Sequence, residues 1–213
     1  MGWSEEEMRS LEIGDNRLNN RVKHTLEKLG EGYSNNFPSC FKTRAELVGA
    51  YRLFDNKFVT AEKIMKGHYA SIVERAKKFP VVLLINDTSS LDYTSKEITG
   101  LGRLEKDYTQ GFFIHSLLAI TPERLSLGIV DNNVWIRGNE GRNKISGGVR
   151  GNQPIEEKES FRWLQSYQNA YSFSQLCMDT KFVFVADRES DILELMTEGM
   201  HKKKEGLNLD FLI

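Results

Sequence analysis

The sequence predicts an α/β protein in two parts, a helical N-terminal domain over residues 1–78 and a sheet-containing domain over residues 79–213. Apolar residues recur with helical spacing up to Pro80, after which continuous apolar runs at 81–85 and 182–186 indicate buried strands. Two longer strand-like stretches lie between those runs. The chain has 213 residues, of which 39% are hydrophobic and 28% charged, the composition of an ordinary globular protein rather than a disordered one.

Three amphipathic helices are predicted in the N-terminal part, each with its own start signal. Asp15 is a candidate N-cap for the first helix, which Gly30 is expected to end. Thr43 and Glu46 form a capping box before the second helix, and Thr60 is a candidate cap for the third. Four apolar residues of the second helix are expected to face the core, namely Leu47, Ala50, Tyr51 and Phe54.

The order of elements in the second part favours a ribonuclease-H-like sheet. A buried strand over 81–85 is followed by an antiparallel hairpin over 112–121 and 125–136, a helix over 156–173, and a second buried strand over 182–186. A further strand begins at Leu209 and runs to the last residue, with nothing after it to cover it. We therefore expect a helical domain followed by a partial, C-terminally truncated ribonuclease-H-like domain.

Asp87 and Asp187 are the candidate metal ligands, because each follows one of the two buried strands. If these strands are parallel neighbours, their carboxylates converge, and two anionic groups held so close need a cation. Carboxylate oxygens favour Mg²⁺ or Mn²⁺, which can stabilise charge on a phosphoryl oxygen. The alternative interpretation is that each aspartate only caps a helix or stabilises a turn.

The charge is unevenly distributed, although the net charge of the whole chain is only -1. Residues 16–80 contain thirteen Lys and Arg against six Asp and Glu, a local excess of +7. On the first helix, four basic residues fall mostly off the apolar stripe and are the candidate phosphate contacts: Arg17, Arg21, Lys23 and Lys28. The alternative is that they form only the solvated face of a helix.

Other classes of protein have less support. No apolar run exceeds five residues, far short of the roughly 18–20 that cross a bilayer, and no signal-peptide pattern is present. Cys40 and Cys177 are too few for a disulfide framework or a zinc site, and predict reduced thiols in a cytosol. A glycosidase would pair Asp87 with Asp92 or Glu97, but no aromatic sugar platform is evident near them.

Six short stretches carry a more specific signal. They are Ile13-Gly14-Asp15-Asn16-Arg17-Leu18, Gly49-Ala50-Tyr51-Arg52-Leu53, Asp87-Thr88-Ser89-Ser90-Leu91, Gly111-Phe112-Phe113-Ile114-His115-Ser116, the segment 157–164, and 186–192. In order and spacing they resemble the bacterial insertion-sequence transposases of the Tn-five and IS-four type, which cut and paste DNA. The resemblance spans nearly the whole chain, from about residue 11 to residue 213.

This resemblance implies that residues 1–78 bind the double-stranded DNA of transposon ends and that residues 79–213 belong to a DDE catalytic core. Asp87 and Asp187 match the first two acids and would hold Mg²⁺ or Mn²⁺ during phosphodiester cleavage and strand transfer. The third acid is a Glu in the pattern Tyr, two residues, Arg, three residues, Glu, six residues, Lys, which no tyrosine of this sequence begins. We expect a truncated fragment with little or no catalysis, because two aspartates hold at best one metal ion firmly.

The resemblance also implies that the region through which the family dimerises is absent, that the chain could associate with full-length transposase, and that it acts in the bacterial cytoplasm at the nucleoid. One alternative is a non-catalytic DNA-binding fragment that inhibits transposition by occupying transposon ends. Another is a pseudogene product that does not fold stably, because the final strand lacks its cover.

Overall fold

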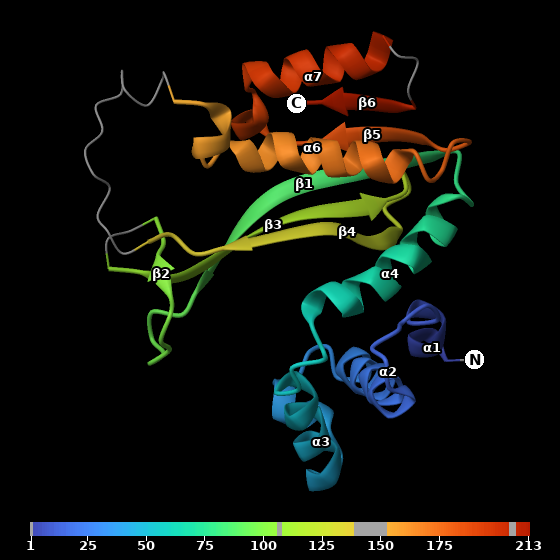
Figure 1. Ribbon diagram of the computed structural model, residues 1–213, viewed down its shortest axis with the longest axis vertical. Helices are drawn as coiled ribbons and strands as arrows, with labels where there is room; N and C mark the ends of the chain where they lie inside the picture. Colours follow the sequence, from blue (N-terminus) through green and yellow to red (C-terminus); the bar gives the residue numbers. More distant parts are fainter. Residues whose placement is uncertain (1, 106–107, 139–152, 205–207) are drawn as a thin grey trace. The chain divides into compact units, whose positions relative to one another are not determined.

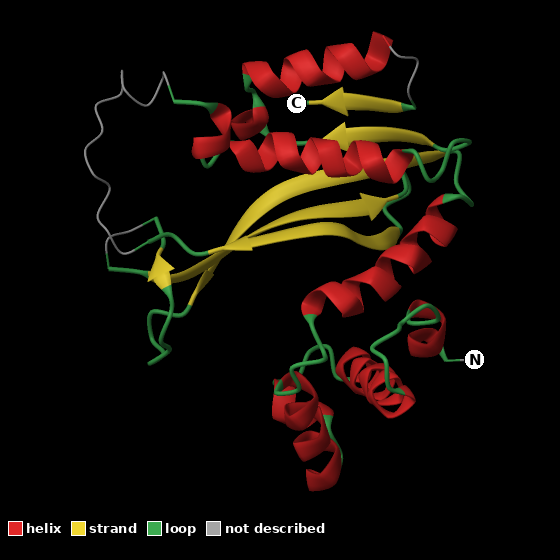
Figure 2. Cartoon of the chain, viewed as in Figure 1, coloured by secondary structure: helices red, strands yellow, loops and turns green. Residues whose placement is uncertain are grey.

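The computed structural model describes residues 2–105, 108–138, 153–204 and 208–213. The chain divides into two compact units, Met1–Glu74 and Arg75–Ile213. Helices come first along the chain and a mixed sheet with helices follows, so the predicted α/β class is confirmed (Figure 2). No described helix is both long and apolar enough to cross a membrane.

Every regular element among the described residues of the first unit is helical. In chain order these elements are α1 (Trp3–Glu7), α2 (Asn16–Glu31), the 3₁₀ helix η1 (Phe37–Cys40), α3 (Arg44–Phe54) and α4 (Ala61–Ala76), whose last two residues belong to the second unit. Their core is a cluster of buried side chains from the N-terminal segment, α2 and α3: Met8, Leu11, Ile13, Val22 and Leu53.

The three predicted helix starts are confirmed. The Asp15 side chain accepts a hydrogen bond from the backbone N–H of Arg17 at 2.7 Å. Thr43 and Glu46 form both bonds of the capping box. The Thr60 hydroxyl accepts from the backbone N–H of residue 63 at 3.3 Å. Each cap satisfies N–H groups that have no partner within their own helix, which is why these local signals can be read directly from sequence.

Two expectations about the helices are wrong. Gly30 does not end α2, which continues to Glu31; a Cβ atom at residue 30 would lie 2.3 Å from Cζ2 of Trp3, so the glycine makes room for an indole. Tyr51 and Phe54 do not face the core, since they are 50% and 56% exposed, whereas Leu53 is 1% exposed. The two exposed rings pack instead around a residue of η1 that helix periodicity alone does not reveal.

The described residues of the second unit form a six-stranded mixed sheet. Its strands are β1 (Val81–Asp92), β2 (Gly102–Arg103), β3 (Gln110–Ile120), β4 (Ser126–Trp135), β5 (Lys181–Val185) and β6 (Leu209–Leu212). The order is β2-β3-β1-β5-β6, and β4 also pairs with β3. The pairs of β3 with β1, β2 and β4 are antiparallel, whereas β1, β5 and β6 run parallel. The predicted hairpin and the predicted parallel pairing of the two apolar strands are confirmed.

β1 is longer than the apolar run that predicts it. The strand continues through polar residues to Asp92 because β3 pairs with it along this whole length, from Leu83 opposite Ile120 to Asp92 opposite Gly111. Asp87 therefore lies inside a strand and not at its end, which corrects the sequence expectation. The two strands approach closely near the far end of the ladder, where a Cβ atom on Gly111 would lie 1.9 Å from the carbonyl oxygen of Leu91.

Helix α6 (Phe161–Ser174) covers one face of the sheet, and α7 (Leu193–Lys204) lies beside it next to β6 (Figure 1). Two aromatic pairs connect α6 to β5: Tyr167 meets Phe184 with ring centroids 5.4 Å apart, and Phe173 meets Phe182 at 5.5 Å. All four rings are fully buried. The helix begins later than the predicted residue 156, because Ile155–Glu157 form the separate 3₁₀ helix η2.

Candidate functional site

Parallel pairing of β1 and β5 brings Asp87 and Asp187 to the same edge of the sheet. The last paired residues are Ile85 and Val185, and each aspartate follows two residues later, Asp87 still within β1 and Asp187 beyond the end of β5. Neighbouring strands lie about 4.8 Å apart, and the two aspartates are equally far in sequence from this last pair of residues. Both are exposed. The structure thus places two exposed aspartates near the carboxyl end of β5, one within β1 and one after β5, and β1 continues past its aspartate.

Each carboxylate is held by a backbone N–H from a residue that follows it. Thr88 donates to Oδ1 of Asp87 at 2.7 Å, and Glu189 donates to Oδ1 of Asp187 at 2.9 Å. Glu189 belongs to the short 3₁₀ helix η3 (Arg188–Ser190), for which Asp187 is the N-cap. One oxygen of each aspartate is therefore fixed to the main chain, which restricts the orientation of the carboxylate.

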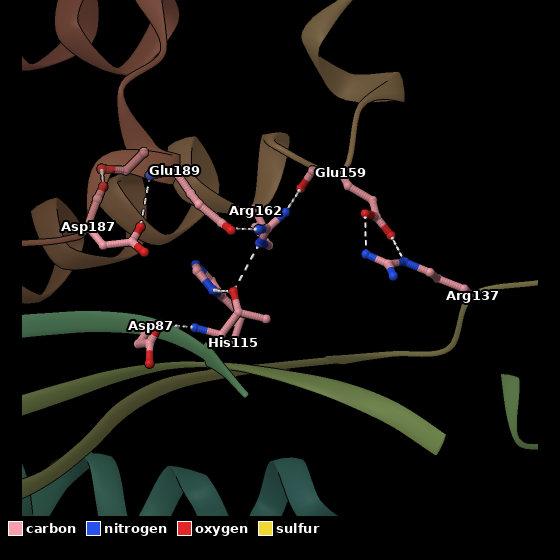
Figure 3. A network of polar contacts seen from close by, with 9 residues as sticks. Asp87, His115, Arg137, Glu159, Arg162, Asp187 and Glu189 are labelled. Atoms are coloured by element: carbon pink, nitrogen blue, oxygen red, sulfur yellow. Dashed lines mark hydrogen bonds and ion pairs between the residues drawn. The ribbon is translucent and has the colours of Figure 1, made fainter. Parts of the chain in front are cut away.

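Arg162, in the first turn of α6, joins the two residues that hold the aspartates (Figure 3). Its Nε donates to the hydroxyl of Thr88 at 3.1 Å, and its Nη2 donates to Oε2 of Glu189 at 2.9 Å. A third bond, from Nη1 to the backbone carbonyl of Glu159 at 2.8 Å, fixes the guanidinium to the chain before α6. The side chain is only 14% exposed. Burial lowers the pKa of Arg162, and the carboxylates of Glu189 and Glu159 oppose that shift.

His115 of β3 lies beneath this network and is 2% exposed. Its Nδ1 is 2.7 Å from the hydroxyl of Thr88. The pKa of His115 is lowered to about 4, mainly by burial and also by the charge of Arg162, while Asp187 opposes the shift. Because Thr88 already accepts a bond from Arg162, we assign its own hydrogen to Nδ1 of a neutral His115. His115 is therefore a hydrogen-bonded core residue.

A second arginine, Arg137, forms an ion pair with Glu159 nearby and provides a comparison with Arg162. Arg137 donates to Glu159 through two parallel bonds, the Nη2–Oε2 bond being 2.7 Å long, and its guanidinium lies 4.2 Å from the ring centroid of Phe113 (Figure 3). The Arg137 hydrogen bond lowers the pKa of Glu159. Neither of the residues that hold the aspartates is bonded to Arg137 by these contacts.

The donor set of the site fits a hard divalent cation with two protein ligands. Mg²⁺ is commonly bound by one or two carboxylates while it keeps several waters, and Asp87 and Asp187 supply two exposed carboxylates. The carboxylate of Glu189 is engaged with Arg162 and so does not complete the set. Among the described residues, no group of three or more His, Cys, Asp and Glu side chains is placed to hold a metal ion.

The four basic residues predicted on α2 do not form one surface. Arg17 and Arg21 are exposed and one turn apart, so they lie on the same side of the helix. Lys28 lies on that side as well, but it is only 14% exposed and forms an ion pair with Glu31 at 2.9 Å. Lys23 projects from the opposite side, because its spacing from Arg21 is two residues. Arg17 and Arg21 are thus the pair best placed to meet a polyanion.

The exposed side of α2 leads to the first turn of α3. His24, three residues after Arg21, lies 3.5 Å from Glu46 of α3. Two further exposed arginines, Arg44 and Arg52, belong to α3 and were not among the predicted contacts. Both lie on the predicted second helix, from which the sequence analysis takes only the capping box and the apolar face.

α3 also exposes two aromatic rings that pack on η1. The ring centroid of Phe37 lies 5.4 Å from that of Tyr51 and 5.7 Å from that of Phe54. These rings form an exposed aromatic cluster in a unit that also carries exposed arginines. Such a combination of flat apolar surface and positive charge suits contacts with a nucleic acid backbone and its sugars.

Residues 1–59 match the family model described as transposase DNA-binding. The first unit therefore carries a transposase DNA-binding domain, and DNA is its partner. The matched residues include α1, α2, η1 and α3, and with them the four predicted phosphate contacts. The exposed arginines of α2 and α3 lie within the same match.

Proposed function

We propose that this chain is a transposase of the bacterial insertion-sequence type, related to the Tn-five and IS-four families, which recognises transposon-end DNA through its first unit. The observation that carries the proposal is the transposase DNA-binding match over residues 1–59. The exposed pair Arg17 and Arg21, next to a capped helix with exposed arginines, supplies the positive surface that phosphate binding requires.

The second unit is proposed to be a ribonuclease-H-like domain with a DDE-type site. Supporting this identity are the three antiparallel strands β1, β3 and β4, followed by a helix and the parallel strands β5 and β6. The placement of one aspartate on β1 and another directly after β5 supports it further. This order of elements is the one that the sequence resemblance implies.

Asp87 and Asp187 would hold Mg²⁺ or Mn²⁺ at this edge of the sheet. A bound divalent cation supplies positive charge that stabilises a phosphoryl oxygen during in-line displacement at phosphorus. The protein's part is to hold both carboxylates oriented, through the backbone N–H groups of Thr88 and Glu189. The largely buried Arg162 adds a fixed positive charge next to Glu189.

Binding without cleavage is the activity expected of this 213-residue chain. The observation that favours it is that the carboxylate of Glu189, which is close in sequence to Asp187, is engaged by Arg162 and does not serve as a third ligand. A missing ligand misplaces the reacting groups, and phosphoryl transfer is very sensitive to such errors. The chain would then act on transposition by occupying transposon ends.

DNA binding is tested by fluorescence anisotropy with a duplex of the inverted repeats that flank the coding sequence and a shuffled duplex, over a range of NaCl concentrations. We expect tighter binding to the repeats, and a log-log salt slope of about -0.9 per neutralised phosphate. Arg17→Ala and Arg21→Ala should each weaken binding and reduce the slope by about 1. Lys203→Ala, which removes the same charge from the second unit, is the matched control.

Cleavage is tested separately on the same duplexes with Mg²⁺ or Mn²⁺. We expect no nicking by the wild-type chain while DNA binding is retained. Nicking that is abolished by Asp87→Asn or Asp187→Asn would show that two aspartates suffice and would overturn the expectation of inactivity. Absence of any DNA binding would overturn both the transposase and the inhibitor interpretations as present activities.

A further inference from the structure

The guanidinium of Arg162 bonds to both of the residues that hold the Asp87 and Asp187 carboxylates, a pair called here the acidic site. Thr88 and Glu189 each use the backbone N–H to hold the carboxylate of an aspartate and the side chain to accept a bond from Arg162. The two aspartates lie a hundred residues apart in sequence, yet their holding residues meet at the same arginine. Both segments therefore make the same two kinds of hydrogen bond, although one is part of a strand and the other forms a 3₁₀ helix.

Arg162 is rigid enough to serve as such a connection. Its guanidinium makes three hydrogen bonds to three segments, which are β1, the residue stretch before α6, and η3. The rings of Trp163 and Trp135 flank it, with centroids 5.3 and 5.7 Å from Cζ. A planar fork with several fixed donors can hold two partners at a set distance, which a lysine ammonium on a flexible stem cannot do.

We propose that Arg162 is a positioning residue that fixes the mutual orientation of the Asp87 and Asp187 carboxylates through Thr88 and Glu189, and thereby sets the affinity of this pair for a divalent cation. The proposal rests on the metal site of the proposed function. Arg162 bonds to the residues that hold the two aspartates and is not hydrogen-bonded to either aspartate by these contacts, so it acts through its two partners. Residues that orient ligands in this way commonly change metal affinity 10–100-fold when they are substituted.

Positioning and simple electrostatics predict opposite results when the arginine is removed. The positive charge of Arg162 interacts with the carboxylate of Asp187, so its loss should strengthen cation binding if charge alone matters. If Arg162 orients the carboxylates, its loss should weaken cation binding despite the more negative site. The direction of the change in affinity therefore distinguishes the two roles.

The test is a titration of the full chain with Mn²⁺ alone, in which electron paramagnetic resonance measures the free ion. We expect Arg162→Gln to bind Mn²⁺ about tenfold more weakly than wild type. Thr88→Val, which breaks one arm without changing charge, should lose several-fold, and Arg162→Lys should not restore full affinity. Arg137→Gln is the matched control, because it removes a neighbouring arginine that contacts neither holding residue; its affinity should stay within about twofold of wild type.

Amide hydrogen exchange in the cation-free protein provides a second measurement. The N–H groups of Thr88 and Glu189 should be protected in wild type and should exchange faster in Arg162→Gln. Unchanged protection, or unchanged or tighter Mn²⁺ binding by Arg162→Gln, would overturn the proposal. If Arg162→Gln does not fold, Thr88→Val carries the test, since unaltered Mn²⁺ affinity in that variant would equally contradict the role of Arg162.

The failure of the proposed metal site has a different signature. Wild-type protein that does not bind Mn²⁺, or binding that survives both Asp87→Asn and Asp187→Asn, would overturn the site itself. The exchange rates of Thr88 and Glu189 would then still decide whether Arg162 holds the two segments together.

Discussion

Gly111 of β3 lies so close to Leu91 of β1 that a Cβ atom at residue 111 would be 1.9 Å from the Leu91 carbonyl oxygen. The obstructing atoms belong to the backbone, so a flexible side chain cannot simply turn away. Gly111 pairs with Asp92, the last residue of β1. The glycine therefore permits the β1–β3 ladder to continue well beyond Asp87.

Gly111→Ala should destabilise the second unit by about 3 kcal/mol, because the strands must separate to admit a methyl group. Urea unfolding followed by tryptophan fluorescence measures the change, since Trp135 and Trp163 both lie in this unit. Gly138→Ala is the matched control, because nothing lies within 4 Å of the position of its added Cβ. Equal stability of the two variants would contradict the close approach.

His115 should make stability depend on pH between about 6.5 and 4. Burial lowers the pKa of His115 to about 4, so below pH 6.5 the unfolded chain binds a proton that the folded chain does not. The contribution of His115 to the free energy of unfolding is fully present above pH 6.5 and is lost progressively as the pH falls. The loss reaches on the order of 3 kcal/mol near pH 4. The groups that face the ring are Thr88, Arg162 and Asp187.

Urea unfolding of wild type and His115→Gln at several pH values isolates this effect from that of the carboxyl groups. Wild type should lose more stability than the variant between pH 7 and pH 5, by about 2 kcal/mol. Parallel stability profiles for the two proteins would contradict the lowered pKa.

Thr43→Ala should destabilise the first unit by about 1 kcal/mol, because it removes the cap of α3. The hydroxyl accepts a bond from the backbone N–H of Glu46 at 3.2 Å, which alanine cannot replace. Thr43→Ser retains the hydroxyl and should stay near wild-type stability. Thermal unfolding followed by circular dichroism compares the three proteins, and a wild-type melting temperature for Thr43→Ala would exclude a role for the cap.

Leu53→Ala should cost about 3 kcal/mol of unfolding free energy, whereas Tyr51→Ala should cost about 1 kcal/mol. Leu53 is buried in the core of the first unit, and Tyr51 is half exposed and contacts Phe37 at the surface. Chemical denaturation of both variants measures their free energies of unfolding and shows which substitution costs more. The reverse ranking would support the core face that the sequence pattern predicts for α3.

Sequence reasoning predicted those features of the fold that depend on local signals. The helix starts at Asp15, Thr43 and Thr60 follow from side chains that bond to N–H groups a few residues away. The parallel pair β1 and β5 follows from two apolar runs of the same length and character. Tyr51 and Phe54 were misplaced because a partner in η1 gives apolar rings a place to pack outside the core.

The acidic site was only partly predictable for a related reason. Two aspartates after two buried strands are visible in sequence, but Arg162 is not, since its partners Thr88 and Glu189 are 74 and 27 residues away. The length of β1 was also hidden, because residues Thr88 to Asp92 are mostly polar and are recruited to the strand by β3. Pairing supplied by a distant segment overrides the local preference of such residues.

The continuation of β1 past Asp87 gives the two aspartates unequal backbone freedom. Asp87 is fixed within a two-stranded ladder, opposite Ser116, whereas Asp187 follows the last paired residue of β5 and starts a 3₁₀ turn. Any adjustment that brings the carboxylates to a common ion therefore falls on the Asp187 segment, while Asp87 sets the reference position. Nuclear relaxation should accordingly find lower order parameters around residue 187 than around residue 87 in the ion-free protein, and a rise at residue 187 alone when Mg²⁺ is added.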